Sequence, residues 1–477
     1  MHRFVLIIDG ETVTAEQRPA IEVTNPATGE VIGNLPCATV DDLDRAAAAA
    51  ARTFGAWSRL SSARRSEILR KAAQITRERE RQIAELLTLE QGKPLKEALG
   101  EVSGIYETLE WFAEEGRRSY GRIVPSSSQN IEFKVQQVPV GPVLILTPWN
   151  FPVAEVATHL APALAAGCTA VIKATEEAPS ATALLVDILH EAGVPHGVVN
   201  LVYGDPAAIS RHLINSPAIR KVAFTGSVAV GKQLAALAGA AMKSTTLELG
   251  GNAPAIVFDD VDLESVATQI AYRKFRNAGQ VCTTPNRIFV ADSVFDDFVD
   301  LMATRAKALK VGPGSDPATE MGPLVNSRRL DAVLKTVHDA VERGGRLVCG
   351  GRRFGNSGFF MEPTVLADVP EDALAVREEI FGPVAVINRF SDIDDVIERS
   401  NSVPVGLASY VFTRSLSRAR TVSEGLQFGM VGVNTLAIST AEYPFGGTKD
   451  SGLGRVGGME GLAQFLEVKT VTTDFSA

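Results

Sequence analysis

Val143-Leu144-Ile145-Leu146-Thr147 is an apolar run that leads directly into Pro148-Trp149-Asn150. It begins a series of such runs, each separated from the next by a helix-like segment, at residues 143–147, 170–173, 198–202, 221–225 and 245–249. A proline stands where the first of these helices are expected to begin, a position that tolerates a missing N–H, at Pro152, Pro179 and Pro206. This alternation predicts an α/β fold in which helices cover both faces of a parallel sheet.

Parallel sheets of this kind bind nucleotides at the carboxyl ends of their strands, beside helix N-termini. The usual Gly-x-Gly-x-x-Gly fingerprint follows none of the runs. Residues 226–232, Gly-Ser-Val-Ala-Val-Gly-Lys, match the phosphate loop of nucleotide hydrolases, but Gln233 stands where a Ser or Thr would bind magnesium. A nucleotide hydrolase is therefore a remote alternative, although Ser227 at a helix N-terminus can still contact a phosphate.

Composition narrows the class of protein further. The chain of 477 residues is longer than one hydrophobic core usually serves, so roughly two or three domains are expected. A net charge of -9 without a basic tract argues against a nucleic-acid partner, and no segment is long enough to cross a membrane. The histidines show no ligand spacing and the cysteines form no C-x-x-C pair, so no metal site is expected and a cytoplasmic protein is predicted. Three cysteines are interpreted as structural: Cys37, Cys168 and Cys349.

Residues 41–115 are expected to form helices. The first helix is predicted to end at Arg52, and a second is predicted to begin at Ser61 or Ser62 and to run through Leu89. Their charged side chains are interpreted as solvated helix faces, and no chemistry is assigned to them.

Residues 122–138 alternate apolar and polar side chains, with Ile131, Phe133 and Val135 on one side, which is the period of a half-exposed strand. A projecting strand leaves an open edge, so this segment is expected to pair with another subunit. Residues 465–473 are also strand-like.

A different kind of signal lies in residues 271–286, Ala-Tyr-Arg-Lys-Phe-Arg-Asn-Ala-Gly-Gln-Val-Cys-Thr-Thr-Pro-Asn. Gly279 before Cys282 and Pro285 after it predict a turn that presents the thiol. Cysteine is a strong nucleophile near neutral pH, and positive or hydrogen-bonding surroundings lower its pKa further. Taken alone, a buried structural thiol is the better interpretation of such a residue.

The segments that follow the apolar runs change that interpretation. They include Pro148-Trp149-Asn150-Phe151-Pro152, Lys173-Ala174-Thr175-Glu176, Gly226-Ser227, Glu248-Leu249-Gly250-Gly251, Gly279-Gln280-Val281-Cys282, Glu378-Glu379-Ile380-Phe381-Gly382-Pro383, Pro444-Phe445-Gly446-Gly447 and Ser451-Gly452-Leu453-Gly454-Arg455. In order and spacing they resemble the motifs of the NAD(P)-dependent aldehyde dehydrogenase superfamily, over essentially the whole chain.

The resemblance implies an aldehyde dehydrogenase-like fold with two parallel-sheet, Rossmann-like domains and a small β oligomerisation arm. It implies the following boundaries: an NAD-binding domain at 1–120 and 139–250, a catalytic domain at 251–450, and an arm at 121–138 and 451–477. A homodimer or homotetramer is expected from that arm.

The resemblance also implies a reaction, the oxidation of an aldehyde to a carboxylic acid with NAD as the hydride acceptor. Cys282 would add to the aldehyde, and the side-chain amide of Asn150 with the backbone N–H of Cys282 would stabilise the oxyanion. Glu248 would take a proton from the water that attacks the thioester, and its apolar neighbours predict a raised pKa. A relative that only binds NAD would be expected to have lost Cys282 or Glu248, and this chain keeps both.

The implied cofactor residues are Trp149, Lys173, Glu176, Gly226, Ser227, Glu379 and Phe381. A carboxylate at Glu176 accepts hydrogen bonds from ribose hydroxyls and would repel a 2′-phosphate, so NAD is favoured while NADP remains possible.

Arg276 resembles the arginine with which succinate-semialdehyde dehydrogenases bind the distal carboxylate of their substrate, and Phe151 and Ser439 are further expected contacts. Thr158 stands where those enzymes carry another arginine. Glutarate semialdehyde, 2-oxoglutarate semialdehyde or an uncharged aldehyde is therefore an open alternative. Two other departures are Thr284 in place of a second cysteine and Val456 in place of a glutamate.

Overall fold

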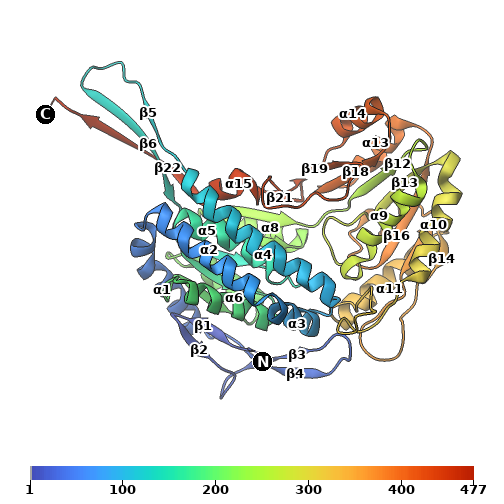
Figure 1. Ribbon diagram of the computed structural model, residues 1–477, viewed down its shortest axis with the longest axis horizontal. Helices are drawn as coiled ribbons and strands as arrows, with labels where there is room; N and C mark the ends of the chain where they lie inside the picture. Colours follow the sequence, from blue (N-terminus) through green and yellow to red (C-terminus); the bar gives the residue numbers. More distant parts are fainter. Residues whose placement is uncertain (1–2, 477) are drawn as a thin grey trace.

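The computed structural model describes residues 3–476 and consists of two large sheets with their helices and a projecting arm (Figure 1). An eight-stranded sheet forms one half of the molecule and a seven-stranded sheet forms the other. The α/β fold with two parallel sheets, predicted from the sequence, is confirmed.

The strand order of the eight-stranded sheet is β2-β1-β9-β8-β7-β10-β11-β21. The central strands from β9 to β11 are parallel, and the antiparallel strands β1, β2 and β21 lie at the edges. The bounds are β1 (Leu6–Ile8), β2 (Glu11–Val13), β7 (Val143–Leu146), β8 (Ala170–Lys173), β9 (Val199–Val202), β10 (Lys221–Gly226), β11 (Ser244–Leu249) and β21 (Gly452–Leu453). Every residue of β7, β8 and β9 is buried, which is why these strands are continuous apolar runs.

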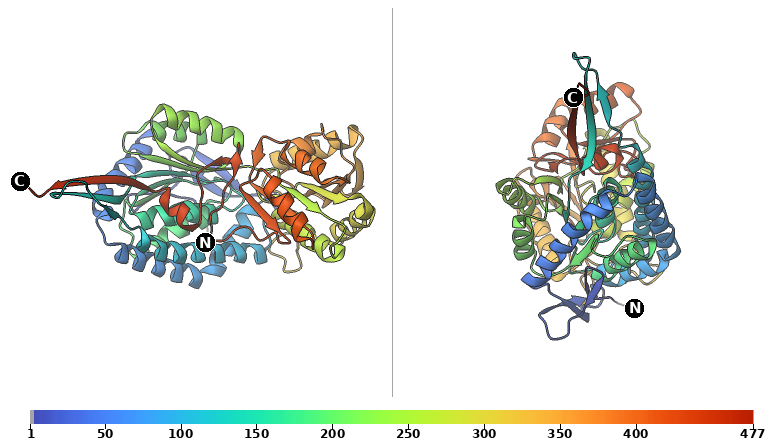
Figure 2. Two further views of the ribbon diagram at one scale, coloured as in Figure 1. Left: turned by 90° about the horizontal axis from the view of Figure 1, so that it is seen from above. Right: turned by 90° about the vertical axis from the view of Figure 1, so that its left-hand side faces the viewer.

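Helices cover both faces of this sheet (Figure 2). On one face α5 (Ala154–Ala166) and α6 (Pro179–Ala192) lie beneath an outer layer of α2 (Ser62–Glu78), α3 (Glu80–Gln91) and α4 (Leu95–Glu115). On the other face lie α1 (Val40–Ser58), α7 (Pro206–Asn215) and α8 (Val228–Ala240). Prolines occupy the first turn of α6 and α7, as predicted, whereas α5 begins only after Pro152.

The helix predictions near the N-terminus need two corrections. The helix predicted to end at Arg52 continues to Ser58, and its cap is Thr39, whose side chain accepts the N–H of Asp42. The single helix predicted through Leu89 is divided into α2 and α3 at Arg79, where φ of -103° and ψ of 14° leave the helical region. No glycine or proline marks this break, so the sequence did not indicate it.

The seven-stranded sheet has the order β14-β15-β16-β13-β12-β18-β19, and only β14 is antiparallel. Its strands are β12 (Pro254–Val257), β13 (Arg287–Ala291), β14 (Arg346–Cys349), β15 (Thr364–Ala367), β16 (Val384–Phe390), β18 (Ala408–Phe412) and β19 (Met430–Val433). Its helices are α9 (Leu263–Phe275), α10 (Phe295–Ala308), α11 (Ser327–Glu342), α12 (Leu374–Arg377), α13 (Ile393–Asn401) and α14 (Leu416–Gly425).

Smaller elements complete the fold. Two short pairs are β3 (Ala20–Thr24) with β4 (Val31–Pro36), and β17 (Val405–Gly406) with β20 (Thr448–Lys449). Helix α15 (Gly458–Ala463) and the turns η1 (Gly116–Arg118), η2 (Arg276–Gly279) and η3 (Asp292–Val294) are the remaining helical segments described. No helix in residues 3–476 has the length and apolar character needed to cross a bilayer.

The arm is a three-stranded antiparallel sheet, β22-β6-β5, that extends away from the eight-stranded half (Figure 1). Strand β6 (Ile131–Pro139) pairs with β5 (Arg122–Val124) and with β22 (Leu466–Asp474). The predicted strand character of both segments is therefore confirmed. Within the described chain β5 and β22 each have one unpaired edge, and Ile123 and Val468 are about two-thirds exposed, at 65% and 64%.

Candidate active site

The residues singled out in the sequence meet where the two sheets adjoin. Strand β11 of the first sheet carries Glu248 and continues through Gly250 and Gly251 into β12 of the second sheet. A Cβ on Gly251 would lie 3.3 Å from the carbonyl oxygen of Cys282. The two glycines therefore allow the strand that carries Glu248 to pass directly beside the loop that carries Cys282.

The Cys282 loop begins with three successive residues in the left-handed region, Asn277 (φ 50°), Ala278 (φ 51°) and Gly279 (φ 72°). A Cβ on Gly279 would lie 2.1 Å from the carbonyl oxygen of Gly382, so only glycine fits there. The turn expected at Gly279 is present, and it begins two residues earlier. Non-glycine residues in this region are strained, a feature that clusters at functional sites.

Cys282 itself is half-buried. Burial raises the pKa of its thiol well above the usual value, and the carboxylates of Glu155, Glu379 and Glu248 raise it further. Only a backbone hydrogen bond lowers this pKa, and burial together with the three carboxylates outweighs it. Both effects favour the thiol over the thiolate, so a nearby proton acceptor would assist its activation.

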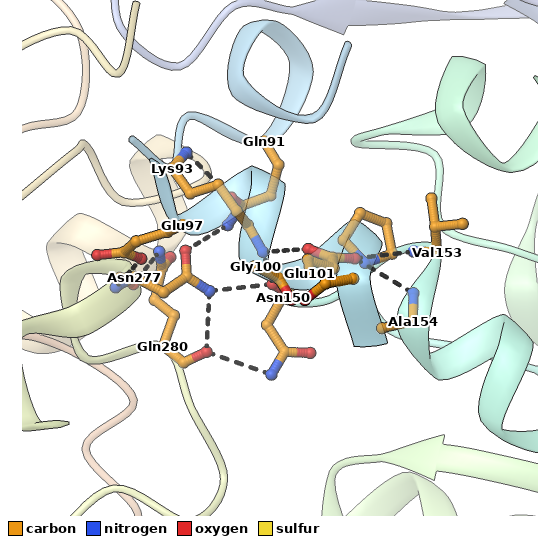
Figure 3. A network of polar contacts seen from close by, with 12 residues as sticks. Gln91, Lys93, Glu97, Gly100, Glu101, Asn150, Val153, Ala154, Asn277 and Gln280 are labelled. Atoms are coloured by element: carbon orange, nitrogen blue, oxygen red, sulfur yellow. Dashed lines mark hydrogen bonds and ion pairs between the residues drawn. The ribbon is translucent and has the colours of Figure 1, made fainter. Parts of the chain in front are cut away.

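Asn150 lies on the loop between β7 and α5 and is held from several sides (Figure 3). Its Nδ2 donates to the carbonyl oxygen of Gln280 (3.2 Å), and its own carbonyl oxygen accepts from Asn277 Nδ2 (3.0 Å) and Lys93 Nζ (2.8 Å). These bonds tie Asn150 to the Cys282 loop. The second Nδ2 proton of Asn150 is left for an oxyanion.

Lys93 and Glu101 lie next to Asn150 and form an ion pair with no side-chain exposure (Figure 3). Glu101 Oε1 also accepts the backbone N–H groups of Val153 (3.1 Å) and Ala154 (3.2 Å), which fixes the start of α5. The prediction that the charges of residues 41–115 are solvated is wrong for this pair, because α4 packs against α5 and excludes water. The only sequence signal was the helix break at Gly92-Lys93-Pro94.

Glu248 has an exposed fraction of only 4%, and neither of its carboxylate oxygens has a hydrogen-bond partner. Burial raises its pKa well above the usual value; Arg455 lowers it and Glu155 raises it. The raised pKa expected from the sequence is present. A Cβ on Gly446 would lie 2.8 Å from Glu248 Oε1, so only a glycine leaves room for this carboxyl group.

A cavity of about 1120 Å³ lies at the carboxyl ends of the strands of the first sheet. Its lining includes Trp149, Lys173, Glu176 and Gly226, so the structure brings these predicted cofactor residues together. Lys173 Nζ is paired with Glu176 Oε1 at 2.7 Å. Ser227 caps the N-terminus of α8 next to Gly226, where its side chain accepts the N–H of Val230 at 3.4 Å.

Glu379 and Phe381 belong to the second half of the molecule and are not among the residues that line this cavity. Phe381 packs edge-on against Trp149 with ring centroids 5.3 Å apart. A Cβ on Gly250 would lie 2.3 Å from Glu379 Oε2, and Glu379 Oε1 has no hydrogen-bond partner. Burial raises the pKa of Glu379 to about 8. The cavity is large enough for a dinucleotide, and the carboxylates of Glu176 and Glu379 can accept hydrogen bonds from ribose hydroxyls. These residues therefore fit NAD(P).

The predicted substrate residues are only partly brought together. The Arg276 guanidinium lies over the Phe151 ring, 5.3 Å from its centroid. Thr158 uses its hydroxyl within its own helix, donating to Ala154 O at 2.9 Å, and supplies no charge. Ser439 is exposed, and no side-chain hydrogen bond in the described chain ties it to the site.

Arg273 was not singled out in the sequence. Its Nε is buried without a hydrogen-bond partner, and in residues 3–476 its guanidinium has no ion pair. Burial lowers its pKa; Arg276 lowers it as well, whereas Tyr410, Tyr272 and Cys282 raise it. Arg273 is therefore close to both Arg276 and the thiol. The available signal was the spacing Arg273-x-x-Arg276 at the end of a helix.

The fold and the site define an α/β enzyme with a dinucleotide-sized cavity and a cysteine at the junction of its two sheets. A family model described as the aldehyde dehydrogenase family matches residues 12–471, and the chain belongs to that family.

Named relatives agree with this assignment. Succinate-semialdehyde dehydrogenase [NADP(+)] GabD of Escherichia coli is 43% identical over 97% of this chain and 96% of that protein. Glutarate-semialdehyde dehydrogenase of Pseudomonas putida is 42% identical over 97% of this chain and 96% of that protein. The crystal structure of betaine aldehyde dehydrogenase from Staphylococcus aureus in complex with NAD+ has a TM-score of 0.97 at 32% identity, covering 100% of this chain and 95% of that one. The protein is an NAD(P)-dependent aldehyde dehydrogenase.

Proposed function

We propose that the physiological substrate is an aldehyde with a distal acid group, with succinate semialdehyde as the first candidate and NAD as the preferred cofactor. The observation that carries this proposal is a pair of guanidinium groups at the end of α9. Arg273 is coupled to the Cys282 thiol, and Arg276 lies over the Phe151 ring. Neither forms an ion pair in the described chain, although Arg276 lowers the pKa of Glu97. Guanidinium groups bind carboxylates through two parallel hydrogen bonds, and an unpaired one is costly to bury.

We propose the following catalytic roles, which the geometry supports. Cys282 attacks the aldehyde carbon, and the Asn150 side-chain amide with the Cys282 backbone N–H stabilises the oxyanion. A nicotinamide cofactor held by the cavity residues would supply the hydride acceptor. Glu248, buried and without hydrogen-bond partners, takes a proton from the water that hydrolyses the Cys282 thioester. Replacing Cys282 by Ala should therefore abolish NADH formation with every aldehyde, and normal turnover by that variant would refute the scheme.

The substrate proposal is tested by Arg276→Leu. Without its guanidinium, kcat/KM for succinate semialdehyde should fall about 10-fold to 100-fold, while kcat/KM for the neutral aldehyde butanal should stay within a factor of about three. Arg273→Leu should lower kcat/KM for succinate semialdehyde in the same way and leave that for butanal nearly unchanged. A matched control is Arg420→Leu, since Arg420 has an 80% exposed side chain on α14 and does not line the cavity. An equal loss for both aldehydes would exclude recognition of the acid group.

The alternatives that remain are glutarate semialdehyde, 2-oxoglutarate semialdehyde and an uncharged aldehyde. The neutral Thr158 and the glutarate-semialdehyde dehydrogenase relative support the first of these. Measuring kcat/KM for all four substrates with the unmodified enzyme ranks them directly.

The cofactor preference rests on Glu176. Its carboxylate lies in the cavity, held by Lys173 and by the N–H of Gly204 at 3.3 Å, where it would repel a 2′-phosphate. We expect kcat/KM to be higher with NAD than with NADP, and Glu176→Ser should narrow the difference. A higher value with NADP in the unmodified enzyme would contradict the proposal.

A homodimer or homotetramer is proposed from the arm. The open edges of β5 and β22 and the exposed Ile123 and Val468 suit pairing with another copy. A monomeric mass in solution at micromolar concentration would contradict it.

A cytoplasmic location is proposed because Cys37, Cys168, Cys282 and Cys349 are free thiols.

A further inference from the structure

A third acidic side chain, Glu155, couples to the thiol and has no part in the mechanism above. It lies in the first turn of α5, where its N–H donates to the carbonyl oxygen of Phe151 at 3.0 Å. It is therefore held on the same rigid turn as Asn150. Among the carboxylates that raise the pKa of Cys282, Glu155 has the largest effect, ahead of Glu379 and Glu248.

The carboxyl group of Glu155 is fixed by Thr225 at the end of β10. The two side chains are hydrogen-bonded, and Thr225 Oγ1 lies 2.8 Å from His159 Nε2. His159 is fully buried, and burial lowers its pKa to about 3, so it is neutral. When His159 Nε2 donates to Thr225, the Thr225 hydroxyl proton points to Glu155, and His159 Nδ1 is left without a hydrogen-bond partner. This arrangement keeps Glu155 as an acceptor.

The same threonine connects Glu155 with Glu248. Thr225 and Glu248 are register partners in the parallel pair β10–β11, so their side chains leave the same face of the sheet. Glu155 raises the pKa of Glu248, as expected for like charges close together. Two further charged groups act on Glu155: Glu101 raises its pKa and Lys93 lowers it. The site therefore holds two coupled carboxyl groups that compete for protons.

We propose that Glu155 is the proton acceptor for the Cys282 thiol, which divides the acid–base work of the site between two carboxyl groups. In this step the Sγ–H bond breaks and an O–H bond forms on Glu155, directly or through one water molecule. The thiolate then attacks the aldehyde carbon. When the thioester is hydrolysed, the departing thiolate takes the proton back from Glu155, while Glu248 serves the attacking water. The proposal rests on the proposed function because it takes Cys282 as the nucleophile.

The environment of Glu155 suits this exchange. Burial raises its pKa to about 7, and a group that accepts and returns a proton works best when its pKa lies near the operating pH. Glu248, with its two unpaired oxygens, remains available for the water. A single carboxyl group would have to serve the thiol and the water in turn.

The test is the pre-steady-state burst of NADH formation with Glu155→Gln at pH 7. The amide is isosteric with the acid and can still accept from Thr225, but it cannot take the proton. We expect the burst rate to fall about 100-fold or more and to rise with pH as hydroxide replaces the missing base. If Glu155 acted only by repelling the thiolate, its removal would lower the pKa of the thiol, and the burst rate would rise instead of falling. An unchanged or faster burst therefore overturns the proposal.

Two further variants separate this role from a structural one. Thr225→Val removes the hydrogen bond that lowers the pKa of Glu155, so the acid limb of the burst rate should move to higher pH. Glu107→Gln, at an exposed glutamate of α4, should leave the burst unchanged. Thermal unfolding and NAD binding should be preserved in Glu155→Gln. If that variant does not fold, Glu155→Asp should retain a burst that is slowed at the same pH, and an unslowed burst would overturn the proposal.

Alkylation of Cys282 by iodoacetamide, without aldehyde or cofactor, tests the proposal independently of the reaction. The alkylation rate of the unmodified enzyme should increase with pH around 7, and Glu155→Gln should react more slowly at that pH. Equal or faster alkylation of the variant would overturn the role of Glu155. Absence of NADH formation with every aldehyde would instead refute the proposed function and leave the alkylation result standing.

Discussion

Two buried polar regions meet at Asn150, and they differ in how fully their atoms are paired. In the first, Lys93 Nζ and both oxygens of Glu101 have partners. In the second, both oxygens of Glu248 and Glu379 Oε1 have none. An unpaired buried polar atom costs about 1–3 kcal/mol, so a fold does not keep such atoms for stability. The paired region holds the geometry, and the unpaired region performs the chemistry.

The largest effect is expected from Glu248→Gln, which alters the unpaired region. Loss of the base should lower steady-state turnover about 10²-fold to 10⁴-fold while the first NADH burst is retained. The free energy of unfolding should not fall, because a neutral amide is cheaper to bury than a carboxylate. Stopped-flow absorbance and urea unfolding measure the two quantities. Loss of the burst itself would place Glu248 earlier in the reaction.

Lys93→Met alters the paired region and should have the opposite signature. It leaves the Glu101 carboxylate buried without its partner, which should lower the free energy of unfolding by about 3–5 kcal/mol in urea. The control is Arg77→Met, because the ion pair of Arg77 with Glu110 is exposed and should contribute less than about 1 kcal/mol. If Lys93→Met were no more destabilising than this control, the network would not be holding the site. The double variant Lys93→Met with Glu101→Met should recover part of the loss.

Asn150→Ala tests the residue that belongs to both regions. Its backbone carbonyl keeps the bonds from Lys93 and Asn277, so the free energy of unfolding should fall by only about 1 kcal/mol. Its side-chain amide is lost, so kcat should fall about 10²-fold to 10³-fold. Steady-state kinetics measure the loss of kcat, and thermal unfolding measures the loss of stability. A stability loss as large as that of Lys93→Met would show that the amide is mainly structural.

The smallest effect concerns pH. The folded-state pKa of Glu379 is raised from its usual value of 4.5 to about 8, so the protonated carboxyl is favoured in the folded protein. Its contribution to stability is fully present below about pH 4.5 and is lost as pH rises toward 8. The melting temperature should therefore fall over this range, and Glu379→Gln should flatten the pH dependence of the free energy of unfolding by about 1 kcal/mol per pH unit. A slope identical to that of the unmodified protein would contradict the raised pKa.

Much of the fold could be predicted from local patterns. The apolar runs predicted strands β7, β8 and β10. The motifs that follow these runs contain Asn150, Glu176 and Ser227. The break between α2 and α3 at Arg79 was missed because its backbone angles are set by packing against neighbouring helices and not by a glycine or proline. Lys93 and Glu101 were taken for solvated charges because a sequence does not show which helix face another helix will cover.

The sequence by itself determined the parallel α/β architecture and the turn before Cys282, whereas the roles of the groups at the strand ends were implied by the resemblance to a family. The architecture and the turn depend on periodicity and on residue types close together in the chain. Only the tertiary structure decided the raised pKa of Cys282, the pairing of Lys93 with Glu101 and the coupling of Glu155 to Glu248. Burial and electrostatic coupling depend on distances between residues far apart in sequence, and folding alone sets those distances.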